Sequence, residues 1–222
     1  MKCDNGQKTV KTTLYVAILY AAACGLTQAQ VWEIGVSGGY PRLTHAILGS
    51  MSPEQPQDTD TKVKGQYSAG ASITRNTKGY YGFELGYTQS RGTATTILRN
   101  TVDSQLVTTT AEGSFKIHML NFNFLAYWMP RSSRWRPYFT GGSQGYQYSL
   151  PRIPSFPFGQ IRKWGFNYGA GIKLIPLKHT LVRLDLRDYL GSKPWGLTFS
   201  QANKTGGVAH QIEGTVGFSI TF

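Results

Sequence analysis

Apolar and polar residues alternate strictly in several segments of this chain, and the carboxy-terminal segment is the clearest example. From Gly214 onward, apolar side chains occupy every second position, at Val216, Phe218, Ile220 and Phe222. A period of two residues is that of a β-strand whose two faces differ. The pattern therefore predicts a terminal strand with one apolar and one polar face.

Seven further segments alternate in the same way, so the sequence predicts eight strands in total. Their approximate ranges are 32–40, 63–73, 80–89, 114–129, 137–148, 164–175, 180–190 and 209–222. The expected long connections are 41–62, 90–113, 149–163 and 191–208, and the short ones are 74–79, 130–136 and 176–179. Long loops at one end and short turns at the other are typical of an up-and-down transmembrane β-barrel.

Composition agrees with a membrane barrel and not with a helical membrane protein. The chain has 222 residues, with 26 Gly, 13 Tyr, 11 Phe and 5 Trp, and only 15% of its residues are charged. After the first thirty residues no apolar run is long enough to span a bilayer as a helix. A search for long apolar runs does not detect transmembrane strands, because their lipid-facing and lumen-facing residues alternate. Closure into a barrel is required because every backbone polar group in hydrocarbon needs a partner.

The first 29 residues have the pattern of a cleavable secretory signal. The range 12–26 is mostly apolar and small, and residues 27–29 offer a small-x-small cleavage site. Three basic residues precede or begin the apolar run: Lys2, Lys8 and Lys11. We therefore expect a signal peptide over 1–29 and an outer-membrane barrel domain over 30–222. A membrane anchor or a buried helix is the alternative for this segment.

Both cysteines of the chain, Cys3 and Cys24, lie inside the removable segment. A mature chain without cysteine excludes disulfides, thiolate catalysis and cysteine metal sites. Lipoprotein processing at Cys24 remains an alternative to cleavage after Ala29. No cofactor is expected.

The chain is strongly basic, with a formal net charge of +12. It has no glycine-rich phosphate loop, zinc-ligand spacing or RNA-binding aromatic signature, so nucleic acid is not expected as a partner. An anionic lipid surface such as lipopolysaccharide phosphates explains the charge better. The basic residues that the expected outer loops would present are Arg42, Lys62, Lys64, Arg91, Arg99, Arg152, Arg162, Lys163, Lys193 and Lys204.

A charged stripe lies on one face of the segment 180–190. Arg183, Asp185 and Arg187 share that face, because the intervening positions are apolar. Facing lipid, such residues would cost several kcal/mol near the midplane, so we expect them to face the lumen. The predicted lumen charge network consists of Glu84, Lys173, Arg183, Asp185, Arg187 and Glu213. It is either a plug in a barrel just wide enough for side chains or a selectivity ring, and barrel size favours the plug.

The opposite faces of the strands supply the expected lipid contacts. The predicted lipid-facing residues are Phe83, Leu85, Phe122, Phe124, Phe166, Ile172, Leu184, Phe218 and Ile220. Amphipathic aromatic residues near strand ends favour the membrane interfaces. Those expected there are Tyr87, Trp128, Tyr138, Tyr148, Trp164 and Phe222. Asp188 is out of phase with the charged stripe and is expected at the outer rim.

The whole mature chain resembles the outer membrane protein β-barrel domain family of Gram-negative bacteria, the group of small OmpA/OmpX-like barrels. The resemblance rests on the signal segment, the alternating strands, the stretch RLDLRDYL at 183–190 and the terminal Phe222. It implies a multi-pass protein of the bacterial outer membrane. It also implies that the barrel-insertion machinery reads Phe222 as part of its signal. The resemblance implies little about molecular activity.

The sequence favours a structural or surface-interaction role, with a plugged polar lumen, basic extracellular loops and an unknown extracellular ligand. A narrow pore for small solutes is the main alternative. An outer-membrane lipid hydrolase is less favoured: position 120, two residues after His118, is Leu where the deacylase resemblance would require Ser. The other histidines are His45, His179 and His210. A soluble lipocalin-like binder, with its apolar faces turned inward, is the rival fold.

Overall fold

The computed structural model describes residues 31–43, 59–77, 79–102, 105–149, 151, 153, 160–177, 179–192 and 208–222. The predicted signal segment, residues 1–29, lies outside these ranges. The strands are β1 (Trp32–Leu43), β2 (Thr59–Asn76), β3 (Tyr81–Val102), β4 (Gln105–Tyr127), β5 (Trp135–Ser149), β6 (Gln160–Leu177), β7 (Thr180–Ser192) and β8 (Val208–Thr221). Within the described ranges there is no helix long and apolar enough to cross a membrane.

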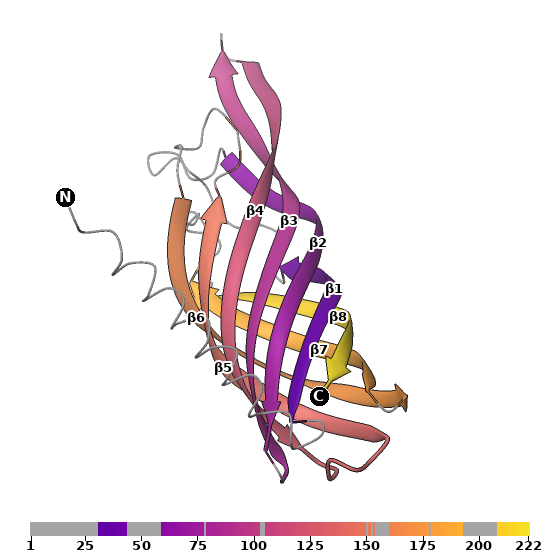
Figure 1. Cartoon of the computed structure of the whole chain (residues 1–222). Helices are drawn as coiled ribbons and strands as arrows, with labels where there is room; N and C mark the ends of the chain where they lie inside the picture. The colour runs from indigo at the N-terminus through magenta and orange to yellow at the C-terminus, as the bar shows by residue number, and fades with distance from the viewer. Residues whose placement is uncertain are drawn as a thin grey trace, which may run out of the picture.

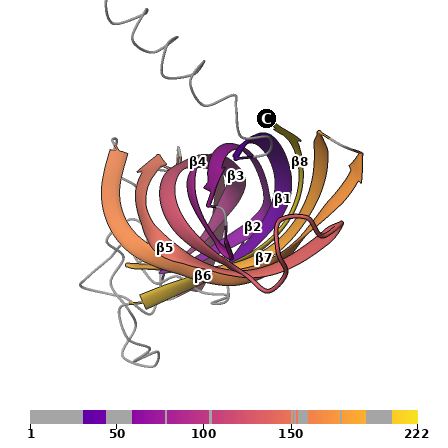
Figure 2. The same ribbon diagram turned by 60° about the horizontal axis from the view of Figure 1, so that its bottom comes forward.

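The eight strands form one closed antiparallel barrel in which each strand pairs with its neighbour in sequence and β8 pairs with β1. Figures 1 and 2 show how the strands curve around a common interior. The seam between β1 and β8 closes with two backbone hydrogen bonds of 3.0 Å between Trp32 and Phe222, one in each direction. Closure removes the unpaired strand edges that lipid would not tolerate. The predicted fold class is confirmed.

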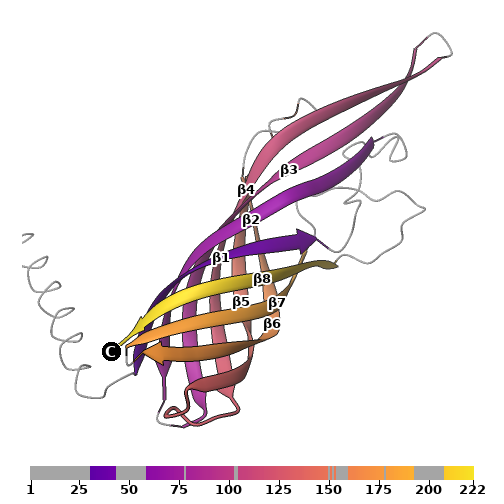
Figure 3. The ribbon, with the colours of Figure 1, turned by 90° about the vertical axis from the view of Figure 1, so that its right-hand side faces the viewer.

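The two ends of the barrel differ in their connections. One end, here called the turn end, holds Trp32 and Phe222 and the short connections after β2, β4 and β6. The opposite end, here called the loop end, holds the connections after β1, β3, β5 and β7. In Figure 3 the carboxy-terminus lies at the turn end, and the strands β3 and β4 project at the loop end.

One of the predicted long loops is wrong. Residues 90–113 form no loop, because β3 and β4 continue as a paired ladder from Ser90–Ile117 to Val102–Gln105. Only residues 103 and 104 separate the two strands. The segment is rich in threonine and other β-branched residues, which favour strands. The resulting hairpin projects beyond the other strands in Figures 1 and 3.

Several basic residues expected in loops therefore lie in strands. Arg42 is in β1, Lys62 and Lys64 are in β2, and Arg91 is in β3. The remaining strand members of the set are Arg99 in β3 and Arg162 and Lys163 in β6. The other three, Arg152, Lys193 and Lys204, lie outside the described residues. These basic residues thus lie in strands more often than the sequence predicted.

Apolar side chains cover the outer surface of the barrel. Eight of the nine predicted lipid-facing residues are exposed there, with exposed fractions between 42% and 70%. The ninth, Ile172, is half-buried. Charged residues such as Glu84 and Lys173 are buried on the inward face. A contiguous exposed apolar surface marks an interaction with lipid or another partner, so the lipocalin-like alternative with inward apolar faces is wrong.

Candidate functional site: the barrel interior

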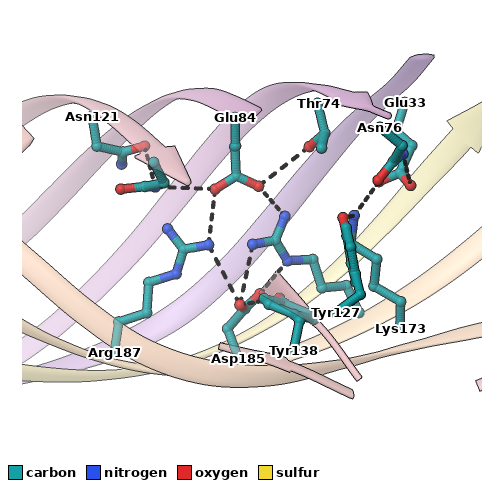
Figure 4. Close-up of polar contacts among 12 residues, drawn as sticks. Glu33, Thr74, Asn76, Glu84, Asn121, Tyr127, Tyr138, Lys173, Asp185 and Arg187 are labelled. Carbon is teal, nitrogen blue, oxygen red and sulfur yellow. Dashed lines mark hydrogen bonds and ion pairs between the residues drawn. The ribbon is translucent and has the colours of Figure 1, made fainter. Parts of the chain in front are cut away.

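A group of ion pairs crosses the barrel between β3 and β7, near the turn end (Figure 4). Arg183 donates a hydrogen bond from Nη1 to Oε2 of Glu84. Arg187 donates from Nη2 to Oε1 of the same carboxylate, at 2.8 Å. The side chains reach one another because all three residues point inward from strands on opposite walls of the barrel. One carboxylate therefore pairs with two guanidinium groups.

Asp185 lies between the two arginines and completes this group. Its carboxylate accepts hydrogen bonds from Arg183, at 2.5 Å from Nε and 3.1 Å from Nη2. Arg187 contributes a longer contact of 3.4 Å. The hydroxyl of Tyr138 on β5 also donates to Asp185. Every charge in the group has a partner of opposite sign, as buried charges require.

A second ion pair lies closer to the turn end. Lys173 on β6 is fully buried, and its Nζ lies 2.5 Å from Oε2 of Glu33 on β1. The same Nζ donates to the hydroxyl of Tyr127 at 2.7 Å, and Asn76 donates to Glu33 at 2.6 Å. The structure thus places Lys173 with Glu33, apart from the group around Glu84 that the sequence predicted for it.

Two tyrosines lie between the ion pairs. The rings of Tyr127 and Tyr138 meet edge to face, with centroids 5.7 Å apart. Lys173 Nζ lies 5.0 Å from the centroid of Tyr127 and 5.7 Å from that of Tyr138. On the other side of Tyr138, the guanidinium of Arg183 lies 5.2 Å from the same ring. Cation–π contacts thus connect the two charged groups.

The charges on the inward face balance. Glu213 lies opposite Arg187 in the β7–β8 ladder and accepts a hydrogen bond from Ser68. Arg136 stacks on Tyr127, with 3.8 Å from its guanidinium carbon to the ring centroid. The charged residues with buried side chains on this face, among those described, are four acids, Glu33, Glu84, Asp185 and Glu213, and four bases, Arg136, Lys173, Arg183 and Arg187. The charged half of the interior is therefore neutral overall.

Little empty space remains at this level. The cavity beside the ion pairs has a volume of about 40 Å³ and is lined by polar groups that include Glu84, Arg187 and Asn121. A cavity of that size and polarity holds a few water molecules. We call this charged region, centred on Glu84 and Lys173, the ionic layer.

The loop-end half of the interior has a different chemistry. Its buried cluster consists of Ala94, Phe115, Ile117, Met119, Tyr146, Tyr148, Ile153 and Tyr189. The rings of Tyr146 and Tyr148 stack with centroids 5.6 Å apart. We call this cluster the apolar layer. The expectation that Tyr138 and Tyr148 lie at a membrane interface is wrong, because both are buried inside the barrel.

Sequence reasoning missed several of these residues, although the sequence carried a signal for them. Glu33 falls in the polar phase of its strand, because the neighbouring Ile34 is apolar and exposed. On β5 the phase of Tyr138, Tyr146 and Tyr148 is opposite to that of the exposed Phe139. Small outward residues on that strand hid the assignment, and Tyr138 and Tyr148 were expected at the membrane interfaces instead.

A smaller polar cluster lies on the outward face in the loop-end half. Asp188 accepts a hydrogen bond from Tyr168 at 3.0 Å, and its Oδ2 lies 2.9 Å from Nδ1 of His210. His118 Nδ1 lies 2.7 Å from the Tyr87 hydroxyl, and His179 Nδ1 lies 3.2 Å from a backbone carbonyl at the turn end. His45 lies outside the described residues. Among those that are described, no three His, Cys, Asp or Glu residues could hold a metal together.

Comparison with known proteins identifies the fold. No protein-family model matches this chain, and no curated protein has a significantly similar sequence. OprG from Pseudomonas aeruginosa has a similar structure, with a TM-score of 0.59, 14% identity, and coverage of 87% of this chain and 97% of that one. AlkL in lipid bilayers has a TM-score of 0.56 and 11% identity, with coverage of 88% of this chain and 90% of that one. Neisserial surface protein A has a TM-score of 0.51 and 11% identity, with coverage of 88% of this chain and 99% of that one. The chain has the fold of the small bacterial outer-membrane β-barrels.

Proposed function

We propose that this protein is an outer-membrane barrel whose lumen is closed by its own side chains. Its role is structural or interactive: the barrel is an anchor that presents the loop end at the cell surface. The observation that carries the proposal is the filled interior, where an ionic layer and an apolar layer lie one above the other. The fold and the apolar outer surface support the location in the outer membrane.

Closure follows from the width of an eight-stranded barrel and from what fills it. Such a barrel is only wide enough for side chains. A selectivity ring needs a continuous aqueous path, whereas the space beside Glu84 amounts to about 40 Å³. A solute would have to displace the paired arginines and then the packed tyrosines. The narrow pore is therefore the weaker interpretation.

The loop end offers a basic surface for contacts outside the cell. Lys64, Arg91 and Arg162 are exposed on β2, β3 and β6, toward the loop end of the barrel. Cations close to an anionic membrane surface contribute about 1 kcal/mol each. We propose that these residues contact lipopolysaccharide phosphates or an acidic partner. In the same proposal, the insertion machinery recognises the strand that ends in Phe222.

Fractionation of cells, followed by gel electrophoresis of boiled and unboiled samples, tests the placement. The proposal predicts recovery in the outer membrane and a mobility shift on boiling, because a closed barrel resists detergent. Recovery in the soluble periplasm without a shift would contradict it. Planar-bilayer recordings of the same protein test closure: no steady conductance is expected, and a steady ohmic conductance would support the pore instead.

Lipid hydrolysis is a second candidate function because one observation favours it. Asp188 orients His210 through a 2.9 Å contact on the lipid-facing surface, which is the arrangement of a general base and its orienting carboxylate. Replacing His210 by Ala should then abolish release of fatty acid from lipid A or phospholipid in proteoliposomes. Equal turnover, or none, by both proteins would exclude this function.

A further inference from the structure

On the outward face near the loop end, an apolar surface changes to a polar one over a single row of residues. Four neighbouring strands, β3 to β6, contribute to this boundary. The last largely apolar row is Tyr87, Leu120, Gly145 and Trp164. The next row, directly above it, is Gln89, His118, Gln147 and Arg162. The boundary therefore marks where the hydrocarbon region would meet the headgroups.

A groove opens at this boundary because β5 has no side chain at Gly145. Its volume is about 380 Å³, and Leu120 and Trp164 form its two walls. Trp164 is 80% exposed, and its ring lies against Gly145 at one side of the groove. A Cβ at Gly145 would lie 3.6 Å from that ring. Below Gly145, the next outward positions of β5 are again small residues, Ser143 and Gly141.

The groove is basic on its β6 side, where Arg162 and Lys163 line it, and a further cation lies beyond it on β4. Arg162 is exposed on β6, and Lys116 is exposed on β4, one row nearer the loop end. Because neighbouring strands are about 4.8 Å apart, these two strands are separated by about 10 Å. Arg91 pairs with Lys116 in the β3–β4 ladder and adds a third cation. The ion pairs found among the described residues involve none of these three.

We infer that this groove binds one molecule of lipid A, the phosphorylated lipid anchor of lipopolysaccharide. An acyl chain lies over Gly145 and Ser143, and the phosphates contact Arg162 on one side and Lys116 on the other. Two separated cations fit a headgroup with two phosphates better than a lipid with one. The inference rests on the proposed placement in the outer membrane, with the loop end in the outer leaflet, and adds a defined site to it.

Retention of lipid by the purified full-length barrel tests the site. The protein is placed in phosphatidylcholine nanodiscs that contain diphosphoryl lipid A, or phosphatidylglycerol at equal negative charge in a parallel arm. Bound lipid is then counted by native mass spectrometry after release into detergent. Wild-type protein should retain one lipid A and no stoichiometric phosphatidylglycerol.

Two pairs of variants test the groove and the charge separately, and each pair contains a matched control. Gly145→Leu fills the groove and should lose the bound lipid A, whereas Gly214→Leu, at an outward glycine on β8 with open space around it, should retain it. Arg162→Gln should lower retention about fivefold, the value expected for one cation at a membrane surface. Arg134→Gln changes the net charge equally at the turn end and should leave retention unchanged.

Three results would overturn the inference: equal retention by Gly145→Leu and Gly214→Leu, equal retention by Arg162→Gln and Arg134→Gln, or retention of phosphatidylglycerol as tight as that of lipid A. All proteins are first tested for the mobility shift on boiling. Wild-type protein that fails this test and stays in the soluble fraction would contradict the proposed function. A shifted barrel without bound lipid A would overturn the groove alone.

Discussion

In the ionic layer, Glu84 holds Arg183 and Arg187 from across the barrel, and Asp185 lies between the two guanidinium groups. The apolar layer lies further toward the loop end, and there Met119 packs among aromatic and aliphatic side chains. Both layers fill the same narrow cross-section. They differ in how they respond to the loss of one member, because a charge left alone in a buried site costs far more than a missing methylene group.

The comparison indicates what each layer contributes. Buried ion pairs add little net stability over apolar packing, since desolvation offsets much of their attraction. They do fix geometry, because each guanidinium accepts only a few orientations of its carboxylate partners. The apolar layer supplies burial that does not depend on orientation. We therefore expect the ionic layer to be intolerant of single changes and the apolar layer to respond in proportion to volume.

The largest effect is expected from Glu84→Leu. This change leaves Arg183 and Arg187 buried with only Asp185 to neutralise them, so the free energy of unfolding should fall by about 3–5 kcal/mol. Urea unfolding in detergent micelles, followed by the mobility shift on boiling, measures the change. A double variant, Glu84→Leu with Arg187→Leu, should recover part of the loss. Wild-type stability in the single variant would break the distinction between the layers.

Met119→Ala tests the apolar layer in the same assay. Removing most of a buried side chain leaves a cavity, and the expected loss is about 2–3 kcal/mol. Met119→Leu conserves volume and should cost less than about 1.5 kcal/mol. If leucine were as costly as alanine, the layer would depend on specific contacts of the thioether and not on volume.

Tyrosine rings pack over glycines in both layers. Substituting such a glycine should lower the free energy of unfolding by less than the changes above. A Cβ at Gly171 would lie 2.5 Å from the hydroxyl oxygen of Tyr138, and one at Gly165 or Gly191 would lie 3.0 Å from the ring of Tyr146. Gly171→Ala should therefore cost about 1–2 kcal/mol, the usual cost of overpacking. Gly214→Ala, with nothing within 4 Å of the new Cβ, is the matched control. Equal stability of the two variants would show that both Tyr138 and the Leu184 carbonyl, 2.7 Å from the new Cβ, shift at no cost.

The smallest change in the free energy of unfolding is expected outside both layers, from shortening the projecting hairpin. Deleting residues 99–108 and joining Leu98 to Thr109 with a two-residue turn removes the β3–β4 pairs that lie beyond the last pair of β2 with β3, Thr59 with Leu98. An isolated two-stranded hairpin is marginally stable at best, so the barrel should lose less than about 1 kcal/mol. A loss as large as that of Met119→Ala would show that the hairpin supports the apolar layer.

The sequence predicted the fold because alternation is a local property. The ladder of β8 against β1 follows from the apolar phase of Val216, Phe218 and Ile220, and eight such segments leave closure as the solution in lipid. The stretch from Arg183 to Arg187 likewise revealed its inward face. Each of these inferences needed only neighbouring residues.

Partners across the barrel were harder to predict, because they depend on register and strand tilt. Lys173 reaches Glu33, which is 140 residues away in sequence, and nothing local to either residue distinguishes that pair from Lys173 with Glu84. The apolar layer was missed for a related reason: the inward phase of Ile117 and Met119 is apolar, so β4 carries apolar residues on both faces. Alternation no longer identifies inside and outside there.

The central claim is that the two layers close the lumen independently, and single-channel recording tests it most directly. Glu84→Ser with Arg187→Ser opens the ionic layer while keeping its charge balanced, and Met119→Ser with Tyr146→Ser opens the apolar layer. The claim predicts no steady conductance for the wild type or for either double variant, and steady openings when all four changes are combined. Steady ohmic conductance through the wild-type barrel would contradict it.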